Sequence, residues 1–206
     1  MKKVAILIAL AVLFAGTPMA RSMTVGSDFG FEIKLPANWT AVSKNDVKSK
    51  PDMVKATFEA ADKDKTLLDL PREFFEKLKE KVAGGEVEYY YKNGEPSFNI
   101  SVYEDAGTLV RVGSDVKETC GLLPEDLSKA MKKPVKVHEC RSKQLGNVSA
   151  LYLVVDAYRE GDRYIQYLVQ KSPDRILMLT ATPRTGKDFE VMKSEFDDIM
   201  KSFRLM

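Results

Sequence analysis

The sequence predicts an α+β fold in which an antiparallel sheet of about six strands has helices on both faces. Three observations lead to this fold class. Strand-like runs follow one another closely in the C-terminal third, an Asn93-Gly94 pair separates two further runs, and an amphipathic segment closes the chain. We expect this last segment to form a helix that packs on the sheet.

The C-terminal third contains consecutive apolar runs separated by short turn sequences. The runs cover residues 135–142, 148–158, 163–171 and 175–182. Gly146-Asn147 and Gly161-Asp162 stand between neighbouring runs, which predicts an antiparallel meander. The run Ile176-Leu177-Met178-Leu179 is apolar without alternation, as is typical of a strand covered on both faces.

One more strand and a hairpin are expected before the meander. Phe31, Ile33 and Leu35 alternate with charged residues, which predicts one face of a strand that ends at Pro36. Asn93-Gly94 tolerates positive φ angles and predicts a hairpin between residues 86–92 and 98–103.

The helical expectations concern three segments. Asp69 is a candidate cap for a helix over residues 71–83, and Pro124 opens a second helix that ends near residue 132. The closing helix, about 187–203, has one apolar stripe. Its members are Phe189, Met192, Phe196, Ile199, Met200 and Phe203. Residues 42–65 are rich in Lys, Asp and Ser and predict a loop with a short strand or turn, without a confident element.

The start of the chain has the three parts of a secretory signal peptide: Lys2 and Lys3, an apolar run from residue 4 to 15, and small residues after it. The apolar run is too short to span a bilayer, which takes about 20 residues. We therefore expect a bacterial Sec-type leader over residues 1–22, cleaved near Ala20 or Ser22. Residues 23–206 would then form a single domain in the periplasm or outside the cell.

Charge excludes some partners. The chain has 32 basic and 30 acidic residues, and Lys2 and Lys3 lie in the expected leader, so 30 basic residues face 30 acidic ones when cleavage follows Ala20. Proteins that bind nucleic acid or anionic membrane surfaces need a basic surplus. We therefore expect no nucleic-acid partner, no stable membrane insertion after leader cleavage, and a monomer.

Both cysteines, Cys120 and Cys140, lie in the exported part of the chain. An even number of cysteines in an oxidising compartment predicts a structural disulfide. The alternative, a redox-active or metal-binding pair, lacks the C-x-x-C spacing that lowers a thiol pKa.

The order of elements resembles the PsbP-like fold family, which includes the extrinsic PsbP subunit of photosystem II and DcrB-like exported lipoproteins. The resemblance is carried by residues 31–39 (Phe-Glu-Ile-Lys-Leu-Pro-Ala-Asn-Trp), the hairpin 152–167, the strand 176–181 and the closing segment 196–203 with Ser202-Phe203. It implies a non-enzymatic accessory, assembly or binding role and transfers no catalytic residue. The sequence lacks the acylated Cys of the lipoproteins and the basic extension of the photosystem subunit, so a general accessory role alone is implied.

Chemical motifs are few. His138 is the only histidine, no Gly-x-Ser-x-Gly elbow is present, and His138-Glu139 lacks the second histidine of a zinc-protease motif. His138 lies two residues from Cys140 and is expected on the same strand face. We predict no catalytic, cofactor-binding or metal-binding residue, and treat His138 as a surface candidate.

Tyr89 and Tyr91 are the other surface candidates. On a strand they share one face and Tyr90 takes the other, so the triplet could display aromatic surface or simply pack in the core. Packing is the simpler interpretation.

Three functional hypotheses follow. The first is an exported, non-enzymatic protein that assists or stabilises a protein or complex of the cell envelope. The second is a periplasmic protein that binds a small molecule or metal ion between the helix at 71–83 and the sheet. The third is a hydrolase that uses His138, and it has the least support because no nucleophile motif accompanies the histidine.

Overall fold

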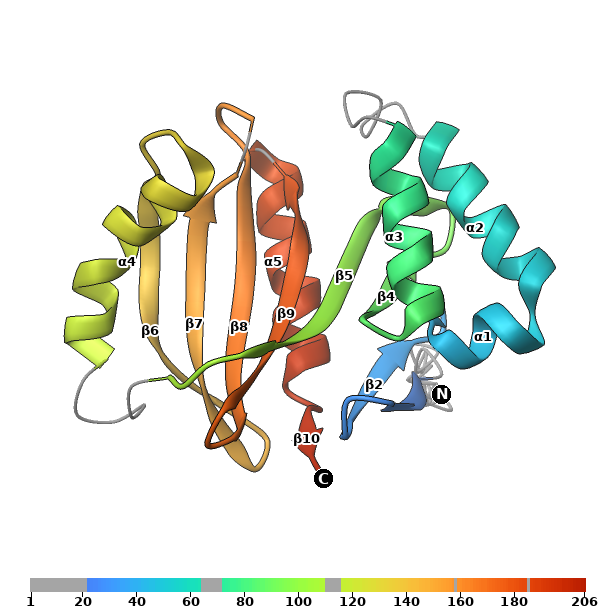
Figure 1. Ribbon diagram of the computed structural model, residues 1–206, viewed down its shortest axis with the longest axis horizontal. Coiled ribbons are helices and arrows are strands. Elements are labelled where there is room, and N and C mark those ends of the chain that lie inside the picture. The colour runs from blue at the N-terminus through green and yellow to red at the C-terminus, as the bar shows by residue number, and fades with distance from the viewer. Residues whose placement is uncertain (1–21, 64–71, 110–115, 158, 185) are drawn as a thin grey trace, which may run out of the picture.

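The computed structural model describes residues 22–63, 72–109, 116–157, 159–184 and 186–206 (Figure 1). The predicted leader therefore lies outside the described residues, apart from Ser22. In chain order the elements are β1 (Ser22–Ser27), β2 (Phe31–Pro36), β3 (Trp39–Val42), α1 (Lys44–Ser49), α2 (Pro51–Lys63), α3 (Arg72–Gly84), β4 (Val87–Lys92), β5 (Glu95–Ala106), α4 (Val116–Met131), β6 (Val137–Leu145), β7 (Val148–Asp156), β8 (Arg163–Ser172), β9 (Arg175–Arg184), α5 (Gly186–Met200) and β10 (Arg204–Leu205).

The main sheet has seven strands in the order β3-β4-β5-β9-β8-β7-β6, and every neighbouring pair is antiparallel. Strands β6 to β9 form the predicted meander. The hairpin between β4 and β5 turns at Gly94, whose φ of 80° lies in the left-handed region that favours glycine. The predicted α+β class is confirmed.

A second, three-stranded sheet has the order β1-β2-β10 and was not expected from the sequence. Strand β2 pairs with β1 along six residues and with the two-residue β10 on its other side. The alternating pattern of Phe31, Ile33 and Leu35 is confirmed, because all three are buried. They belong to the small sheet, which folds against the main one.

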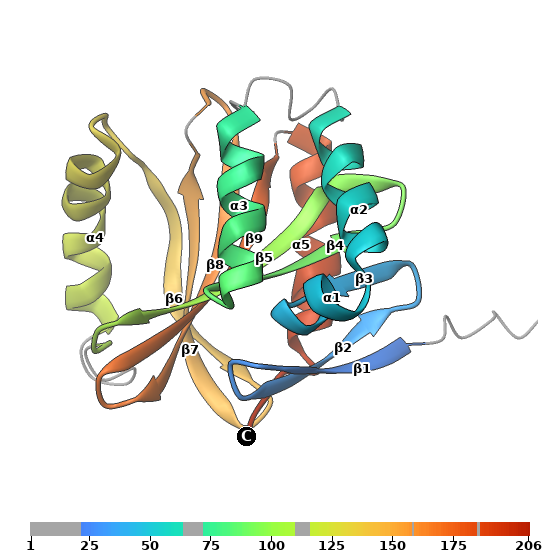
Figure 2. The same cartoon turned by 45° about the vertical axis from the view of Figure 1, so that its right-hand side comes forward.

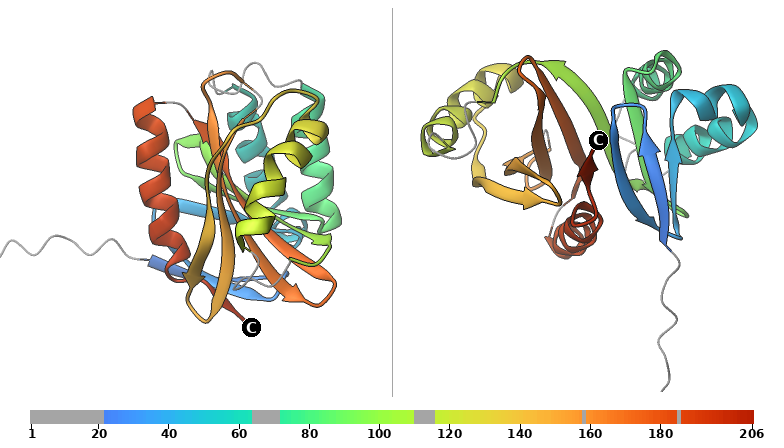
Figure 3. Two further views of the ribbon diagram at one scale, coloured as in Figure 1. Left: turned by 90° about the vertical axis from the view of Figure 1, so that its left-hand side faces the viewer. Right: turned by 90° about the horizontal axis from the view of Figure 1, so that it is seen from below.

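The two faces of the main sheet are covered differently. Helices α2, α3 and α4 lie on one face, whereas α5 and the small sheet lie on the other (Figure 3). Strand β4 illustrates the division. Tyr89 packs with the cluster under α2 and α3, and Tyr90 packs with the cluster under α5 and the small sheet.

The predicted stripe of the closing helix is confirmed. Phe189, Met192, Phe196, Ile199 and Met200 are buried against the main sheet. The helix ends at Met200, so Phe203 follows it in an irregular segment and stacks on Phe31 with ring centroids 5.1 Å apart. The C-terminal segment thus fastens the small sheet to the rest of the core.

The prediction of a loop over residues 42–65 is wrong, because α1 and α2 occupy most of this segment. The Asp46 carboxylate accepts hydrogen bonds from the Ser43 backbone N–H and hydroxyl, which fixes the start of α1. Helix α2 starts at Pro51, a favourable first position, and buries Val54 and Phe58. Its apolar stripe is too narrow to stand out among the charged residues of the segment.

The helix expected from Pro124 begins earlier, at Val116, and Pro124 lies inside it. Val116, Cys120, Leu123, Leu127 and Met131 pack against the sheet at helical spacing. The sequence reasoning assigned Cys120 only to the disulfide and so missed the first two turns. Helix α3 confirms the helix expected at 71–83, whereas its proposed cap Asp69 and Pro71 lie outside the described residues. No helix in the described ranges is long and apolar enough to cross a membrane.

Candidate binding surface

A strip of half-buried side chains lies in the middle of the main sheet, on the face that carries α2, α3 and α4. Strands β8 and β9 lie between α4 and α3 in Figure 1, and half-buried residues of these strands border the apolar cluster under α4. The strip consists of Ser101 and Tyr103 from β5, Tyr164 and Gln166 from β8, and Met178 and Thr180 from β9, all partly exposed. We call these six residues the central strip.

Sheet register brings these residues together. Ser101 pairs with Thr180, and Thr180 pairs with Gln166, so these three residues form one row across β5, β9 and β8. Tyr103 pairs with Met178 in the next row. Because directly paired residues point to the same face, the six side chains form one continuous surface.

Hydrogen bonding orders the polar part of the strip. The Gln166 side-chain amide donates to the Thr180 hydroxyl at 2.8 Å. Burial raises the pKa of Tyr103, and burial together with the neighbouring Tyr103 raises the pKa of Tyr164. Both phenols therefore stay neutral near neutral pH and can donate a hydrogen bond to an incoming group.

The strip carries no ionisable group that is charged at neutral pH, although charged residues make up 30% of the chain. Interface cores have this composition, since they are depleted in charged residues and enriched in tyrosine and methionine. A sheet also holds side chains in fixed positions better than a loop does. The central strip can therefore recognise a partner through aromatic, thioether and amide contacts.

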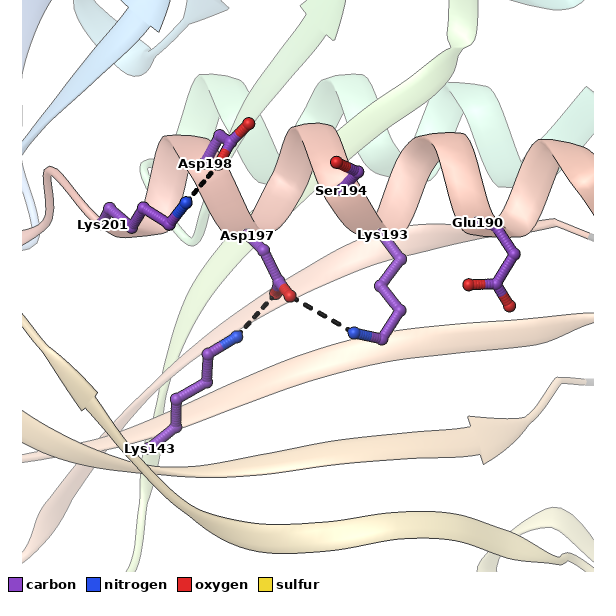
Figure 4. A pocket seen from close by; sticks show the side chains of 7 residues that line it. All are labelled: Lys143, Glu190, Lys193, Ser194, Asp197, Asp198 and Lys201. Carbon is purple, nitrogen blue, oxygen red and sulfur yellow. Dashed lines mark hydrogen bonds and ion pairs between the residues drawn. The ribbon is translucent and has the colours of Figure 1, made fainter.

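A hollow lies on the opposite face of the main sheet, beside α5 (Figure 4). It encloses about 330 Å³ and is lined by Lys143, Glu190, Lys193, Ser194, Asp197, Asp198 and Lys201. Its basic and acidic side chains are equal in number, and most contact each other. Asp197 accepts from Lys143 at 2.9 Å, from Lys193 at 3.3 Å and from the Tyr167 hydroxyl at 2.5 Å.

The charges of this hollow are used to hold α5 on the sheet. Burial alone would raise the pKa of Asp197, but the Tyr167 hydroxyl and the Lys143 ammonium outweigh it and lower that pKa. Burial and the nearby Asp197 charge raise the pKa of Tyr152, which lies under the Lys143 ammonium, to about 12. Lys143, Lys193 and Asp197 therefore form one ion-pair cluster between β6 and α5.

His138 lies at the surface, on the edge strand β6. A bulge between Val137 and Glu139 interrupts the strand at this point. The regular alternation that placed His138 and Cys140 on one face of the strand therefore does not hold here. Nε2 of His138 is 2.6 Å from Oδ1 of Asp156, whose other carboxylate oxygen accepts from the Lys136 backbone N–H. Burial by itself would raise the pKa of Asp156, but the hydrogen bonds from His138 and from the Lys136 backbone N–H together outweigh it and lower that pKa.

The histidine and its carboxylate lack the third member of a hydrolytic triad. Among the described residues, no hydroxyl or thiol is hydrogen-bonded to the His138 ring, and the nearby Cys140 is bonded to Cys120. The pair joins the first residues of β6 to the last residue of β7.

The prediction that Tyr89 lies at the surface is wrong, because α2 covers its side chain. It is 3% exposed and stacks on Phe58 and Tyr91, with both pairs of ring centroids 6.0 Å apart. Tyr91 is partly exposed, and its hydroxyl is 2.8 Å from the Thr57 hydroxyl of the same helix. The unexpected helix α2 thus makes Tyr89 a core residue and packs against the partly exposed Tyr91, in agreement with the packing interpretation.

Cys120 and Cys140 form a disulfide, with Cα atoms 5.7 Å apart. It joins α4 to β6 at the edge of the main sheet. No group of three or more His, Cys, Asp or Glu side chains that could hold a metal ion occurs in the described part of the chain.

Sequence reasoning missed the central strip. Its members come from the consecutive strands β8 and β9 and from β5, which is distant from them in sequence, and the β5–β9 pairing that joins them cannot be read from periodicity. The available signal was weak: Tyr164 and Gln166 alternate with the buried Ile165 and Tyr167, which left a half-polar face on β8.

No protein-family model matches the sequence, and no curated protein matches it significantly. Solved structures do match the fold. CyanoP, the PsbP protein of the cyanobacterium Synechocystis sp. PCC 6803, aligns over 93% of this chain and 96% of its own, with a TM-score of 0.51 and 14% identity.

The chain has the PsbP-like fold.

Two further solved structures align with lower scores. The immunity protein TplEi of Pseudomonas aeruginosa, solved with a peptide, aligns over 89% of this chain and 98% of its own, with 11% identity and a TM-score of 0.42. The Ran-binding protein Mog1p of Saccharomyces cerevisiae covers 90% of this chain and 96% of its own, with 12% identity and a TM-score of 0.40.

The apolar residues at both ends of the PsbP-like resemblance, such as Phe31, Trp39 and Phe203, are core residues. Phe31 stacks on Phe203, and Trp39 packs edge-on against Phe98 while its indole N–H donates to Glu195 of α5 at 2.8 Å. The Ser202 hydroxyl oxygen accepts a hydrogen bond from the Lys34 backbone N–H at 2.7 Å. These motifs of the PsbP-like fold therefore close the small sheet onto α5.

Proposed function

We propose that this protein is an exported, non-enzymatic accessory protein that binds a protein of the cell envelope through the central strip. The observation that carries the proposal is an uncharged row of half-exposed Tyr, Gln, Met and Thr side chains on a rigid sheet, in a chain otherwise rich in charge. The disulfide and the leader-like first residues support an oxidising compartment outside the cytoplasm.

The absence of enzymatic activity is part of the proposal. Its support is that His138 is paired with a surface carboxylate away from any described nucleophile, and that the charged cluster on α5 is internally paired. The ionisable groups described above thus have structural partners instead of an open position for substrate.

The test is site-specific photo-cross-linking in the exporting cell. Benzoylphenylalanine placed at Tyr103 or at Tyr164 should give one discrete cross-linked product with an envelope protein, since either ring would lie in the interface. Leu122 of α4 and Val191 of α5 are matched controls, because they are 57% and 56% exposed but lie outside the strip. The proposal fails if the control positions cross-link as strongly as the strip, or if neither strip position gives a discrete product.

A small-molecule binding protein is the second candidate, and the hollow beside α5 is the observation that favours it. Its volume of about 330 Å³ falls within the range of ligand sites, but such sites are mostly apolar and this one is lined by paired charges. Thermal-shift measurements across a metabolite set would distinguish the two, because a ligand at 100 times its dissociation constant stabilises the folded state by about 2.7 kcal/mol.

A further inference from the structure

Strand β1 has an outer edge that is open and lacks the usual protection. It pairs with β2 without a break in register from Ser22 to Ser27, and it is the outermost strand of the small sheet (Figure 2). Its sequence, Ser-Met-Thr-Val-Gly-Ser, contains no charge and no proline. Open strand edges are normally blunted by charges, proline, bulges or short length, because their unpaired N–H and C=O groups can pair with another strand.

The other sheet edges are protected. Strand β6 carries Glu139, Arg141 and Lys143, has a bulge at His138, and lies against α4. Strand β3 is four residues long with β2 beside it, and β10 has two residues. Among the described strands, β1 is therefore the one with a long, uncharged and unbroken edge.

We propose that a second copy of this chain pairs with β1, edge to edge and antiparallel, about a two-fold axis through Thr24. A two-fold axis perpendicular to the sheet keeps each side chain on its own face of the sheet. Odd-numbered residues of one copy therefore pair with odd-numbered residues of the other, and even-numbered with even-numbered. Centring the axis on Thr24 places Thr24 opposite its own counterpart and Met23 of each copy opposite Val25 of the other. The two small sheets then form one six-stranded sheet across the dimer.

This register is self-complementary in chemistry. Met23 and Val25 lie on the face that carries Leu35 and Ile33, their partners in β2, which is the face turned to the core. Met23 is 48% exposed, and dimerisation would cover it with an apolar neighbour. On the opposite face the paired Thr24 side chains can hydrogen-bond to each other. No charged side chain of the strand opposes the pairing.

The test is sedimentation velocity of the leader-cleaved protein over a range of concentrations. Wild type should move from monomer to dimer as concentration rises. Thr24→Lys and Thr24→Glu each put like charges opposite one another at the axis, and each should weaken dimerisation at least about tenfold. An equimolar mixture of the two variants should recover the dimer, since Lys then faces Glu.

The control is Ser149→Lys, a charge added at an exposed strand residue of β7, which should leave the dimer unchanged. Thr24 is exposed, so circular dichroism of both variants should match wild type; Met23→Lys replaces either one that does not fold. A wild type that stays monomeric at every concentration would overturn the proposal. So would a dimer that survives Thr24→Lys, or a Lys and Glu mixture that dimerises no better than its components.

This interface is separate from the central strip, so the photo-cross-linking result and the sedimentation result can succeed or fail independently. It also replaces the expectation of a monomer, which depended on composition and charge. Neither of those properties indicates which strand edges remain open.

Discussion

Asp197 is the residue on which the attachment of α5 most depends electrostatically. Its carboxylate accepts from two lysines, one on β6 and one on α5, and from a tyrosine on β8. It lies next to Asp198, which pairs with Lys201 at 2.6 Å but is 65% exposed. Two neighbouring carboxylates therefore have the same chemistry and very different surroundings.

We predict that Asp197→Asn lowers the free energy of unfolding by about 1–3 kcal/mol, because it leaves Lys143 and Lys193 close together without an anion. Asp198→Asn, the matched control, should change it by less than about 0.5 kcal/mol, because water screens an exposed pair. Urea denaturation at neutral pH measures both. Equal losses in the two variants would show that Asp197 has no special role.

Glu88 is a buried carboxylate in β4, 3% exposed, which accepts from the Asp28 backbone N–H at 2.7 Å and from the Tyr90 hydroxyl. Burial raises its pKa above the ordinary value of 4.5, against the hydrogen bonds from Tyr90, Ser27 and Asp28. The folded state thus holds the proton more tightly than the unfolded state. Above pH 4.5, stability contributed by the protonated form is lost as pH rises through the folded pKa.

We predict that Glu88→Gln reduces this loss of stability between about pH 4.5 and the folded pKa, because the variant has no carboxyl group to ionise there. Denaturation curves recorded at intervals from about pH 4 to pH 8 give the slope for each protein. The control is Glu86→Gln, at an exposed residue of the preceding turn, which should retain the wild-type slope. Parallel profiles for wild type and Glu88→Gln would contradict the prediction.

Helix α4 is the element that depends most on a single covalent link. It lies at the end of the main sheet, over β6, and none of its residues is fully buried. The Cys120–Cys140 bond therefore holds a helix whose packing on the sheet is incomplete. Among the described residues, the other helices on this face, α2 and α3, also pack on each other.

We predict that the double variant Cys120→Ala, Cys140→Ala loses about 3 kcal/mol of stability, the value expected for opening a loop of this length. Hydrogen exchange should rise first in α4, while the core strands β7 to β9 stay protected. Wild type treated with a thiol reductant should behave like the double variant, and the reductant should have no effect on the variant itself. Uniform loss of protection across the sheet would exclude a local role for the bond.

At the level of elements, the sequence predicted those whose apolar pattern is strong. The meander, the Asn93-Gly94 hairpin and the stripe of α5 appear as expected, because each has a long periodic run or a specific turn dipeptide. Helices α1 and α2 were missed, because their burial is limited to a few residues such as Val54 and Phe58 among many charges. Tertiary contact with β4 stabilises α2 where periodicity alone is weak.

At the level of the whole molecule, the two sheets meet at the turn between β6 and β7. Asn147 in this turn donates to the Leu205 carbonyl at 2.9 Å and accepts from the Leu205 N–H at 3.0 Å. Gly146 has a φ of 48°, and a Cβ added there would lie 1.9 Å from the Phe203 carbonyl oxygen. A side chain at Gly146 would therefore force the main sheet and β10 apart.

We predict that Gly146→Ala is more destabilising than Gly94→Ala by at least about 1 kcal/mol, as overpacking usually costs about 1–3 kcal/mol. Gly94 is a matched control, because it also has a positive φ, 80°, but no atom lies within 4 Å of an added Cβ. Its substitution should cost only the backbone strain, about 1–2 kcal/mol. If urea denaturation shows the same loss of unfolding free energy for both variants, the predicted clash between the methyl group added by Gly146→Ala and the Phe203 carbonyl would have no energetic cost.

The general fold was accessible from the sequence, whereas the candidate site was not. Periodicity identifies which residues of a strand share a face, but it does not determine that β5 pairs with β9 and so places Tyr103 beside Met178. Nor does it separate β2 from the main sheet, since an alternating strand fits either. The central strip and the open edge of β1 both follow from this pairing order, which only the folded chain reveals.

Strand β2 has partners from opposite ends of the described chain, β1 just before it and β10 at residues 204–205. While a ribosome still holds those last residues, the small sheet has an empty side and Phe31 has no aromatic ring to stack on. Native closure of the small sheet must then wait until residues 203–205 are free to reach β2.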